Sequence, residues 1–352
     1  MGSKMLQIVL ENSTYQAVPS TGARPGTFLM LGMDTELLLR TPKGEVVFPH
    51  QIGMPQERPA PTEPPLSSVW KGYYGDWHGD GYAAELCVTP FNCIDRGMAW
   101  ISNTLGHLRL KRGGVVDAIA GFEIDVPVIY SVPEEVVKGA PEQVRMLGCM
   151  PSFSVYNEEA NPSALGENER TTGFHMHMSN PWLNSERADT AIKWADIYCG
   201  SIWTLIAPTD PKAEARRRQC YGRAGEHRKN IYPSREFGFE YRVLPGTVLS
   251  HPVYTSMMFS LFRHAFHAAR LAEPPTELTQ MARVAINEAD RVVALELMKQ
   301  LPMTDSSSLL VRRLIECTLE PLSTDSLITA LAAGIGHQKF ILAPTLYNLK
   351  PR

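Results

Sequence analysis

The strongest constraint on this chain is a set of short segments in which apolar residues alternate with ionisable ones. The clearest is GFHMHMS, residues 173–179, where one methionine separates His175 from His177. Successive side chains of a β-strand point to opposite faces of the sheet, so residues two apart share a face. The segment therefore predicts a strand with one apolar face and one face that carries two imidazoles.

Three further segments repeat this pattern. They are FLMLGMDTELLLR (28–40) with Asp34 and Glu36, GYAAELCVTP (81–90) with Glu85, and FGFEYRVLPG (237–246) with Glu240 and Arg242. Burying several carboxylates without partners costs several kcal/mol each. Bound cations would offset that cost, and carboxylate oxygens suit Mg²⁺ or Mn²⁺.

Each segment alone has a simpler interpretation. Asp34 and Glu36 would fit a solvated strand face, Glu85 a pairing with an arginine, and Glu240 with Arg242 a structural ion pair. The pair of histidines also occurs in cupins, which need an acid about four residues after the second histidine. Here MSNPWLN follows, with no acid before Glu186, which argues against a cupin.

Positive charge is concentrated in residues 212–242, which hold nine Lys or Arg against four Glu. We expect Arg216, Arg217 and Arg218 to lie on a solvated loop. Arg223 and Arg228 lie among glycines in YGRAGEHR, where a guanidinium can meet phosphate oxygens. The sequence has neither a P-loop nor a Rossmann glycine motif.

Composition excludes several classes of protein. The chain has 352 residues, 44% of them hydrophobic, and a formal net charge of -3, which argues against nucleic-acid binding. It has no apolar run of about 18 residues and no signal peptide, so we expect a cytoplasmic protein without a membrane span. The leading MGSK receives no weight.

The cysteines are scattered and lack C-x-x-C spacing, so we expect reduced core thiols and no zinc site built on cysteine. They are Cys87, Cys93, Cys149, Cys199, Cys220 and Cys317.

Loops and helices complete the expected organisation. The proline-rich stretch 49–65 and the polar stretch 157–173 predict loops, and loops within 49–80 and 150–172 are expected to shape a substrate pocket. WKGYYGDWHGDGY, residues 70–82, fits either a ligand-stacking loop or a packed one. Helices are expected at 184–207, 251–272, 279–301, 306–318 and 323–334.

Together these motifs resemble the glutamine synthetase-like carboxylate–amine ligases, the group that includes the glutamate–cysteine ligases. GMDTELLLR, DGYAAELCVTP, TTGFHMHMS, YGRAGEHR and FGFEYRVLPG occur in the family order across residues 28–250. The closest likeness is to the phage-associated branch, often called amidoligases. The resemblance implies an α+β fold in which a curved antiparallel sheet lines the active site and helices pack on its outer face.

The resemblance also implies ATP, held through Mg²⁺ with Mn²⁺ as an alternative. The metal ligands would be Asp34, Glu36, Glu85, His175 and Glu240. Asp34 stands where the family more often has Glu. His175 would contact a metal or the nucleotide phosphates, and His177 would bind the nucleotide or orient His175. Arg242 would hold the transferring phosphoryl group, and Arg223 and Arg228 would assist with phosphate or the substrate carboxylate. Arg242, Arg228 and Glu36 would be the catalytic residues.

The expected reaction is ATP-dependent amide formation from a small-molecule or peptide carboxylate and an amine, through an acyl phosphate, in a bacterial or phage-infected cell. The alternatives are a guanidino-kinase-like phosphotransferase on the same fold, a non-catalytic binding protein and a metal-dependent hydrolase. We expect an N-terminal segment (1–26), a catalytic domain (27–275) and a helical extension (276–352). A homo-oligomer is also expected.

Overall fold

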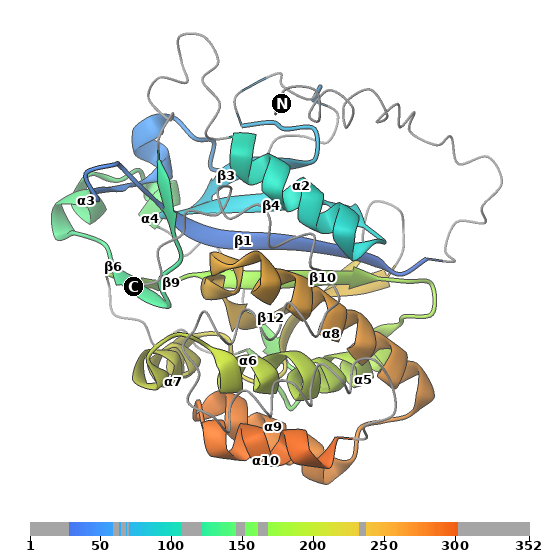
Figure 1. The fold of residues 1–352 in the computed structure, drawn as a ribbon. Coiled ribbons are helices and arrows are strands. Elements are labelled where there is room, and N and C mark those ends of the chain that lie inside the picture. Colours follow the sequence, from blue (N-terminus) through green and yellow to red (C-terminus); the bar gives the residue numbers. More distant parts are fainter. Residues whose placement is uncertain are drawn as a thin grey trace, which may run out of the picture.

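The computed structural model describes residues 28–58, 63, 64, 68, 70–107, 122–145, 152–160, 168–231 and 237–301. Its centre is a ten-stranded sheet whose main path runs β3-β4-β1-β10-β12-β11-β7-β8, with every paired neighbour antiparallel (Figure 1). The strands of this path are β1 (Met30–Arg40), β3 (Gly75–Asp80), β4 (Ala83–Phe91), β7 (Phe153–Ser154), β8 (Asn157–Ala160), β10 (Gly173–Ser179), β11 (Glu226–Ile231) and β12 (Phe237–Pro245).

Short strands extend the sheet at the far end of β1, where β2 (Val46–Val47) and β5 (Glu123–Asp125) both pair with it. A separate two-stranded sheet joins β6 (Ile129–Ser131) to β9 (Glu169–Thr171). Two short helices, α3 (Glu134–Gly139) and α4 (Glu142–Arg145), follow β6.

Helices form a layer on one face of the sheet, in which some pack directly on the strands and others pack on neighbouring helices. They are α2 (Ile94–His107), α5 (Ser185–Ala195), α6 (Ser201–Ile206), α7 (Pro211–Cys220), α8 (Pro252–Leu271), α9 (Thr276–Asn287) and α10 (Arg291–Gln300). In Figure 1, α2, α8 and α5 lie across the same side of the sheet.

The apolar face of the strands explains this layer. Phe259 of α8 packs edge-on against Phe91 and Phe174, and Phe262 packs against Phe239 and Tyr241. All of these side chains are buried. The alternation seen in the sequence thus places one set of residues against the helices and the other set on the opposite face. This confirms the predicted α+β class, an antiparallel sheet with helices on one face.

A π-turn, Asp196–Gly200, joins α5 to α6. Asp196 is fully buried there and accepts hydrogen bonds from the hydroxyls of Tyr156 and Tyr241, each at 2.8 Å. Burial raises the pKa of Asp196 to about 7, against the opposing effect of these hydrogen bonds. The widened turn therefore ties the helical layer to β12 at Tyr241.

Several boundaries differ from the sequence predictions. The single helix expected at 279–301 is two helices. Ala289 adopts a left-handed backbone (φ 52°), and Asp290 caps α10 by accepting from the N–H groups of Val292 and Val293. Because Asp290 accepts hydrogen bonds from the free N–H groups at the start of α10, it favours the beginning of a new helix over the continuation of α9.

Three stretches expected to be loops contain regular structure. A 3-10 helix, Pro49–Ile52, begins the proline-rich stretch, because proline fits a first helical turn and Gln51 Oε1 accepts from Phe48 N–H at 2.9 Å. The stretch 157–173 contains β8 and β9, each held by a partner strand. Residues 70–82 contain β3, and its Trp77 is fully buried in the core.

The other helix predictions are mostly confirmed. The segment 184–207 forms α5, the π-turn and α6, capped by Asn184, and 251–272 forms the buried helix α8. A further 3-10 helix, Gly246–Ser250, precedes α8. The helices expected at 306–318 and 323–334, the segment 1–26 and two of the cysteines (Cys149 and Cys317) lie outside the described residues.

Candidate functional site

Strand register brings most of the predicted site residues onto the face opposite the helices. Asp34 pairs with His175, Glu36 with Glu85, and Glu240 with both His177 and Arg228. Arg242 lies two residues beyond Glu240 on the same face. Residues from five strands, far apart in sequence, therefore form one continuous polar surface across β4, β1, β10, β12 and β11.

Asp34 joins the two histidines. Its Oδ1 lies 2.9 Å from His175 Nδ1, and its Oδ2 lies 2.9 Å from His177 Nε2. Burial acts to raise the pKa of Asp34, but the charges of both histidines and their hydrogen bonds outweigh burial and hold that pKa well below its usual value. The carboxylate thus stays ionised and orients both rings.

His175 lies at the centre of the polar face and is 2% exposed. Its Nδ1 is 3.3 Å from Glu240 Oε1, and its Nε2 is 3.9 Å from Glu36 Oε1. The hydroxyl of Tyr221 lies 2.7 Å from the same Nε2. A Cβ at Gly173 would lie 2.3 Å from Nε2, so the ring has room only because that residue is glycine.

Glu36 and Glu85 are buried carboxyl groups whose pKa values are raised. Burial raises the pKa of Glu36 to about 7; His175 opposes the rise, and Asp80 and Glu85 add to it. Burial also raises the pKa of Glu85 to about 7, helped by the charge of Asp34. A divalent cation between such groups would remove the repulsion and restore the ionised forms.

Glu36 is held in place by the backbone as well. Its Oε2 accepts a hydrogen bond from the N–H of Gly173 at 2.8 Å, across β1 and β10. One carboxylate oxygen is therefore engaged and the other faces His175. This fixes the side chain with a single oxygen directed toward the site.

Arg242 supplies positive charge at the edge of the acids. It is 1% exposed and pairs with Glu240 Oε1, while Arg228 lies 3.6 Å from Glu240 Oε2. The guanidinium of Arg242 stacks over the ring of Tyr221, 5.2 Å from its centroid. Two of the three arginines expected to bind phosphate thus flank one carboxylate.

Arg223 is placed differently from the other predicted residues. Its carbonyl oxygen accepts from Glu226 N–H at 3.1 Å, and the side chain is half-buried. Within the described part of the chain, no ion pair joins it to the acids of the site. Its assignment to phosphate therefore stays a prediction.

The expectation of a loop at Arg216, Arg217 and Arg218 is wrong for all three, and the expectation of solvent exposure is wrong for Arg217 and Arg218. All three lie on α7, and only Arg216 is exposed, where it pairs with Glu169. Arg217 is fully buried and donates to the carbonyl oxygens of Val243 and Leu244 at 2.9 and 3.0 Å. Main-chain carbonyls at the end of β12 offset the cost of burying this charge.

Among the residues that the structure describes, three groups of donor atoms are close enough to hold a metal ion, with the donor atoms of each group within 4.8 Å of one another. They are Asp34, Glu85 and His175; Asp34, His177 and Glu240; and His78, Glu85 and Cys87. The first two consist of oxygen and imidazole donors and include four of the five predicted ligands. Glu36 lies beside the first group through His175.

Sequence reasoning missed Tyr221, His78, Cys87 and Asp80 as members of this face. His78 Nε2 lies 2.7 Å from Glu85 Oε2. GDWHGD (75–80) has Asp76, His78 and Asp80 in the same alternating phase as the other strands, so the signal was present but lay in a stretch assigned to a loop. Burial raises the pKa of the Cys87 thiol well above its usual value, with the nearby Glu85 adding to the rise.

No protein family and no curated protein that was compared matches this sequence. Among solved structures, a bifunctional glutathione synthetase from Pasteurella multocida aligns with a TM-score of 0.42 and 11% identity over 88% of this chain and 49% of that one. A glutamine synthetase from Plasmodium falciparum aligns with a TM-score of 0.39 and 8% identity over 92% of this chain and 75% of that one. The aligned region spans about half of the glutathione synthetase chain. At these identities the likeness concerns the course of the backbone alone.

None of the helices in the described part of the chain is both long and apolar enough to cross a membrane.

Proposed function

We propose that this chain is an ATP- and Mg²⁺-dependent ligase that joins a carboxylate to an amine. The observation that carries the proposal is the meeting, on one sheet face, of the carboxylates of Asp34, Glu36, Glu85 and Glu240 with His175, His177, Arg228 and Arg242. The carboxylates on this face repel one another, and the pKa values of Glu36 and Glu85 are raised to about 7. Such a face is suited to binding metal cations together with an anionic substrate.

The proposed metal ligands are Asp34, Glu36, Glu85, His175 and Glu240, with His177 orienting Asp34 or binding the nucleotide. Hard oxygen donors with some imidazole fit Mg²⁺ or Mn²⁺. Bound there, the ions would neutralise the triphosphate and polarise the phosphoryl group that is transferred. Asp34 has a shorter side chain than glutamate, but its contacts with both histidines keep it at the centre of the donor atoms.

The arginines would act on the phosphoryl group. Arg242 and Arg228 flank Glu240, so their guanidinium groups lie where negative charge would develop on the transferring phosphate. Arg223 is the third arginine proposed to assist with phosphate or the substrate carboxylate. Glu36 has one oxygen held by Gly173 and one facing inward, which suits a fixed metal ligand.

The chemistry explains why phosphate and amine would share one site. A carboxylate does not condense with an amine at neutral pH, because its oxygen is a poor leaving group. Transfer of the γ-phosphoryl group from ATP to the carboxylate releases ADP and gives an acyl phosphate. The neutral amine then attacks the acyl carbon, phosphate leaves, and a nearby carboxylate accepts the proton lost from nitrogen.

Hydroxylamine trapping tests the proposal. The full chain with ATP, Mg²⁺, hydroxylamine and a panel of amino acids and short peptides is expected to yield a hydroxamate for the correct carboxylate. Glu36→Ala and Arg242→Ala should each abolish it, while Glu296→Ala, on the exposed side of α10, should leave it unchanged. Full activity in both site variants would overturn the assignment.

The same assay separates the alternatives. ADP release that depends on a guanidino acceptor, without any hydroxamate, would instead support a phosphotransferase. Turnover without ATP would support a hydrolase, and no turnover of any kind would support a binding protein. The substrates, and any homo-oligomer, remain parts of the proposal that this assay and a sedimentation measurement would define.

A further inference from the structure

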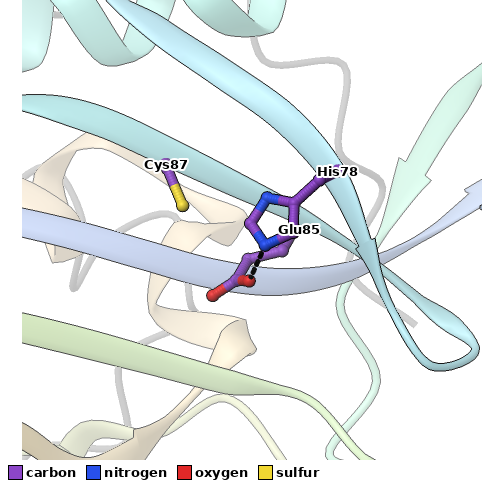
Figure 2. A group of neighbouring side chains, drawn as sticks. All are labelled: His78, Glu85 and Cys87. Carbon is purple, nitrogen blue, oxygen red and sulfur yellow. Dashed lines mark ion pairs between the residues drawn. The ribbon is translucent and has the colours of Figure 1, made fainter. Parts of the chain in front are cut away.

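His78, Glu85 and Cys87 form a group of metal-donor types beside the proposed Mg²⁺ site. His78 lies on β3, and Glu85 and Cys87 lie two residues apart on β4, so all three share the polar face. Figure 2 shows the imidazole, the carboxylate and the thiol side by side along these two strands. Their donor atoms lie within 4.8 Å of one another.

The group is enclosed and incompletely satisfied. Residue exposure is 9% for His78, 9% for Glu85 and 3% for Cys87. His78 Nε2 faces Glu85, but Nδ1 of the same ring is buried and has no hydrogen-bond partner among the described residues. A buried ring nitrogen without a partner is costly unless a ligand or a water meets it.

Charged side chains of both signs surround the three donors. Cys87 of β4 lies opposite Asp34 of β1 on one side and opposite Asp76 of β3 on the other. The nearby Lys71 and Arg58 both pair with Asp76, at 3.2 and 3.5 Å. Asp34 and Asp80 add negative charge beside Glu85, and Arg58 adds positive charge beside Cys87 as well as beside Asp76.

We propose that His78, Glu85 and Cys87 bind a divalent transition-metal ion of borderline softness, with Zn²⁺ as the ion that fits best. One sulfur, one nitrogen and one oxygen donor match the ligands that Zn²⁺ takes, and hard Mg²⁺ does not take a thiolate. On binding, the thiol proton of Cys87 passes to solvent and a sulfur–metal bond forms. Three protein ligands leave a fourth tetrahedral position for water or substrate.

Glu85 connects this site to the proposed Mg²⁺ site. It also belongs to the group with Asp34 and His175, and a carboxylate has two oxygens that can serve two ions. The transition-metal site requires neither ATP nor ligase chemistry, so it can be tested, and can fail, without reference to the proposed function.

Cobalt substitution tests the sulfur ligand directly. The full chain, stripped by a chelator and loaded with Co²⁺ without ATP, is expected to show a thiolate-to-cobalt charge-transfer band and strong tetrahedral visible bands. Cys87→Ser should abolish the charge-transfer band, and His78→Ala should weaken Zn²⁺ affinity by about tenfold or more. Cys199→Ser is the matched control, because Cys199 is also buried but lies in the π-turn between α5 and α6.

X-ray absorption of the Zn²⁺-loaded wild-type chain keeps the test decisive if a variant fails to fold. One sulfur scatterer at about 2.3 Å, with nitrogen or oxygen at about 2.0–2.2 Å, is expected. A shell of nitrogen and oxygen alone would overturn the proposal. It would equally be overturned by a wild-type chain without the cobalt–thiolate band, or by a band that Cys199→Ser removes and Cys87→Ser retains.

Discussion

Asp34 shows how a single residue can organise a polar face. Each of its carboxylate oxygens lies 2.9 Å from a different histidine, and together these partners outweigh burial and lower the pKa of the acid. Glu36, two residues along the same strand, lies beside His175 at 3.9 Å and has a pKa raised to about 7. Two acids on the same strand thus have pKa values shifted in opposite directions, because their neighbouring groups differ.

The raised pKa of Glu36 predicts a stability effect with a definite sign. The folded pKa of about 7 lies above the ordinary value of 4.5, so the folded chain keeps a proton that the unfolded chain releases. The resulting stabilisation is present below pH 4.5 and is lost as pH rises to about 7. Glu36→Gln cannot ionise, and should exceed the wild type in unfolding free energy at pH 8 by up to about 3 kcal/mol.

Urea unfolding in a chelator at several pH values measures this difference. The wild type and Glu36→Gln should have similar stability at pH 4.5 and diverge toward pH 8, the variant being the more stable. The control Glu296→Gln, at an exposed surface pair, should stay within about 0.5 kcal/mol of the wild type throughout. Parallel curves for Glu36→Gln and the wild type would contradict the assigned pKa.

Removing the Tyr221 hydroxyl should reduce the rate of hydroxamate formation more than it reduces the free energy of unfolding. Its hydroxyl meets His175 Nε2 at 2.7 Å, and its ring lies beneath the guanidinium of Arg242. Tyr221→Phe keeps the ring and removes the hydroxyl. Hydroxamate formation should fall about 10- to 100-fold, as for other residues that orient a metal-binding histidine, while the free energy of unfolding falls by only about 1 kcal/mol.

The matched control for this variant is Tyr73→Phe, because Tyr73 is 63% exposed. It should leave both the rate and the melting temperature unchanged. Tyr221→Phe with wild-type turnover would show that the hydroxyl is dispensable for positioning His175.

At the scale of elements, α7 is held against the end of β12 by buried guanidinium groups. Gly222 follows α7 with a left-handed backbone (φ 76°), and a Cβ there would lie 2.1 Å from Arg217 Nη1. Gly222→Ala should therefore destabilise the chain by about 1–3 kcal/mol, because it combines backbone strain with displacement of a buried charge.

Gly106→Ala is the matched control and should act in the opposite direction. Gly106 lies within α2, and a Cβ there has nothing within 4 Å. Alanine favours a helix over glycine, so the free energy of unfolding should rise by a few tenths to about 1 kcal/mol. Thermal unfolding of both variants measures the contrast, and a neutral Gly222→Ala would show that Arg217 can move without cost.

The elements also show how far the sequence could predict the fold. The segment 173–179 is a strand with the predicted bounds, because a strict alternation of apolar and polar residues fits only period two. The segment at 279–301 was harder, since its apolar spacing continues through the break at Ala289. Local pattern identifies a helix well but identifies poorly the single residue at which one helix stops and another begins.

For the molecule as a whole, the sheet separates a helical layer from a polar face. If that face binds cations, Mg²⁺ should stabilise the folded chain by about 2.7 kcal/mol at a hundred times Kd. The melting temperature should therefore rise as the Mg²⁺ concentration rises above Kd. Binding must displace protons from Glu36 and Glu85, whose pKa is about 7, so the shift should be larger at pH 8 than at pH 6.

Differential scanning fluorimetry across Mg²⁺ concentrations at both pH values tests this expectation. Glu36→Gln should reduce the shift, because a neutral amide is a weaker ligand. A shift that is equal at pH 6 and pH 8 would indicate that the ion binds elsewhere, away from the two acids with raised pKa.

The sequence by itself determined which residues lie on one face of each strand, because side-chain alternation is a local property of extended backbone. It therefore contained the set Asp34, Glu36, Glu85, His175, His177, Glu240 and Arg242. Only the tertiary structure decided strand order and register, which place Glu36 opposite Glu85 and His78 beside it. Those pairings depend on which strands pack against the same helices. The free energy of that packing is spread over the whole core, so no local segment of sequence reveals it.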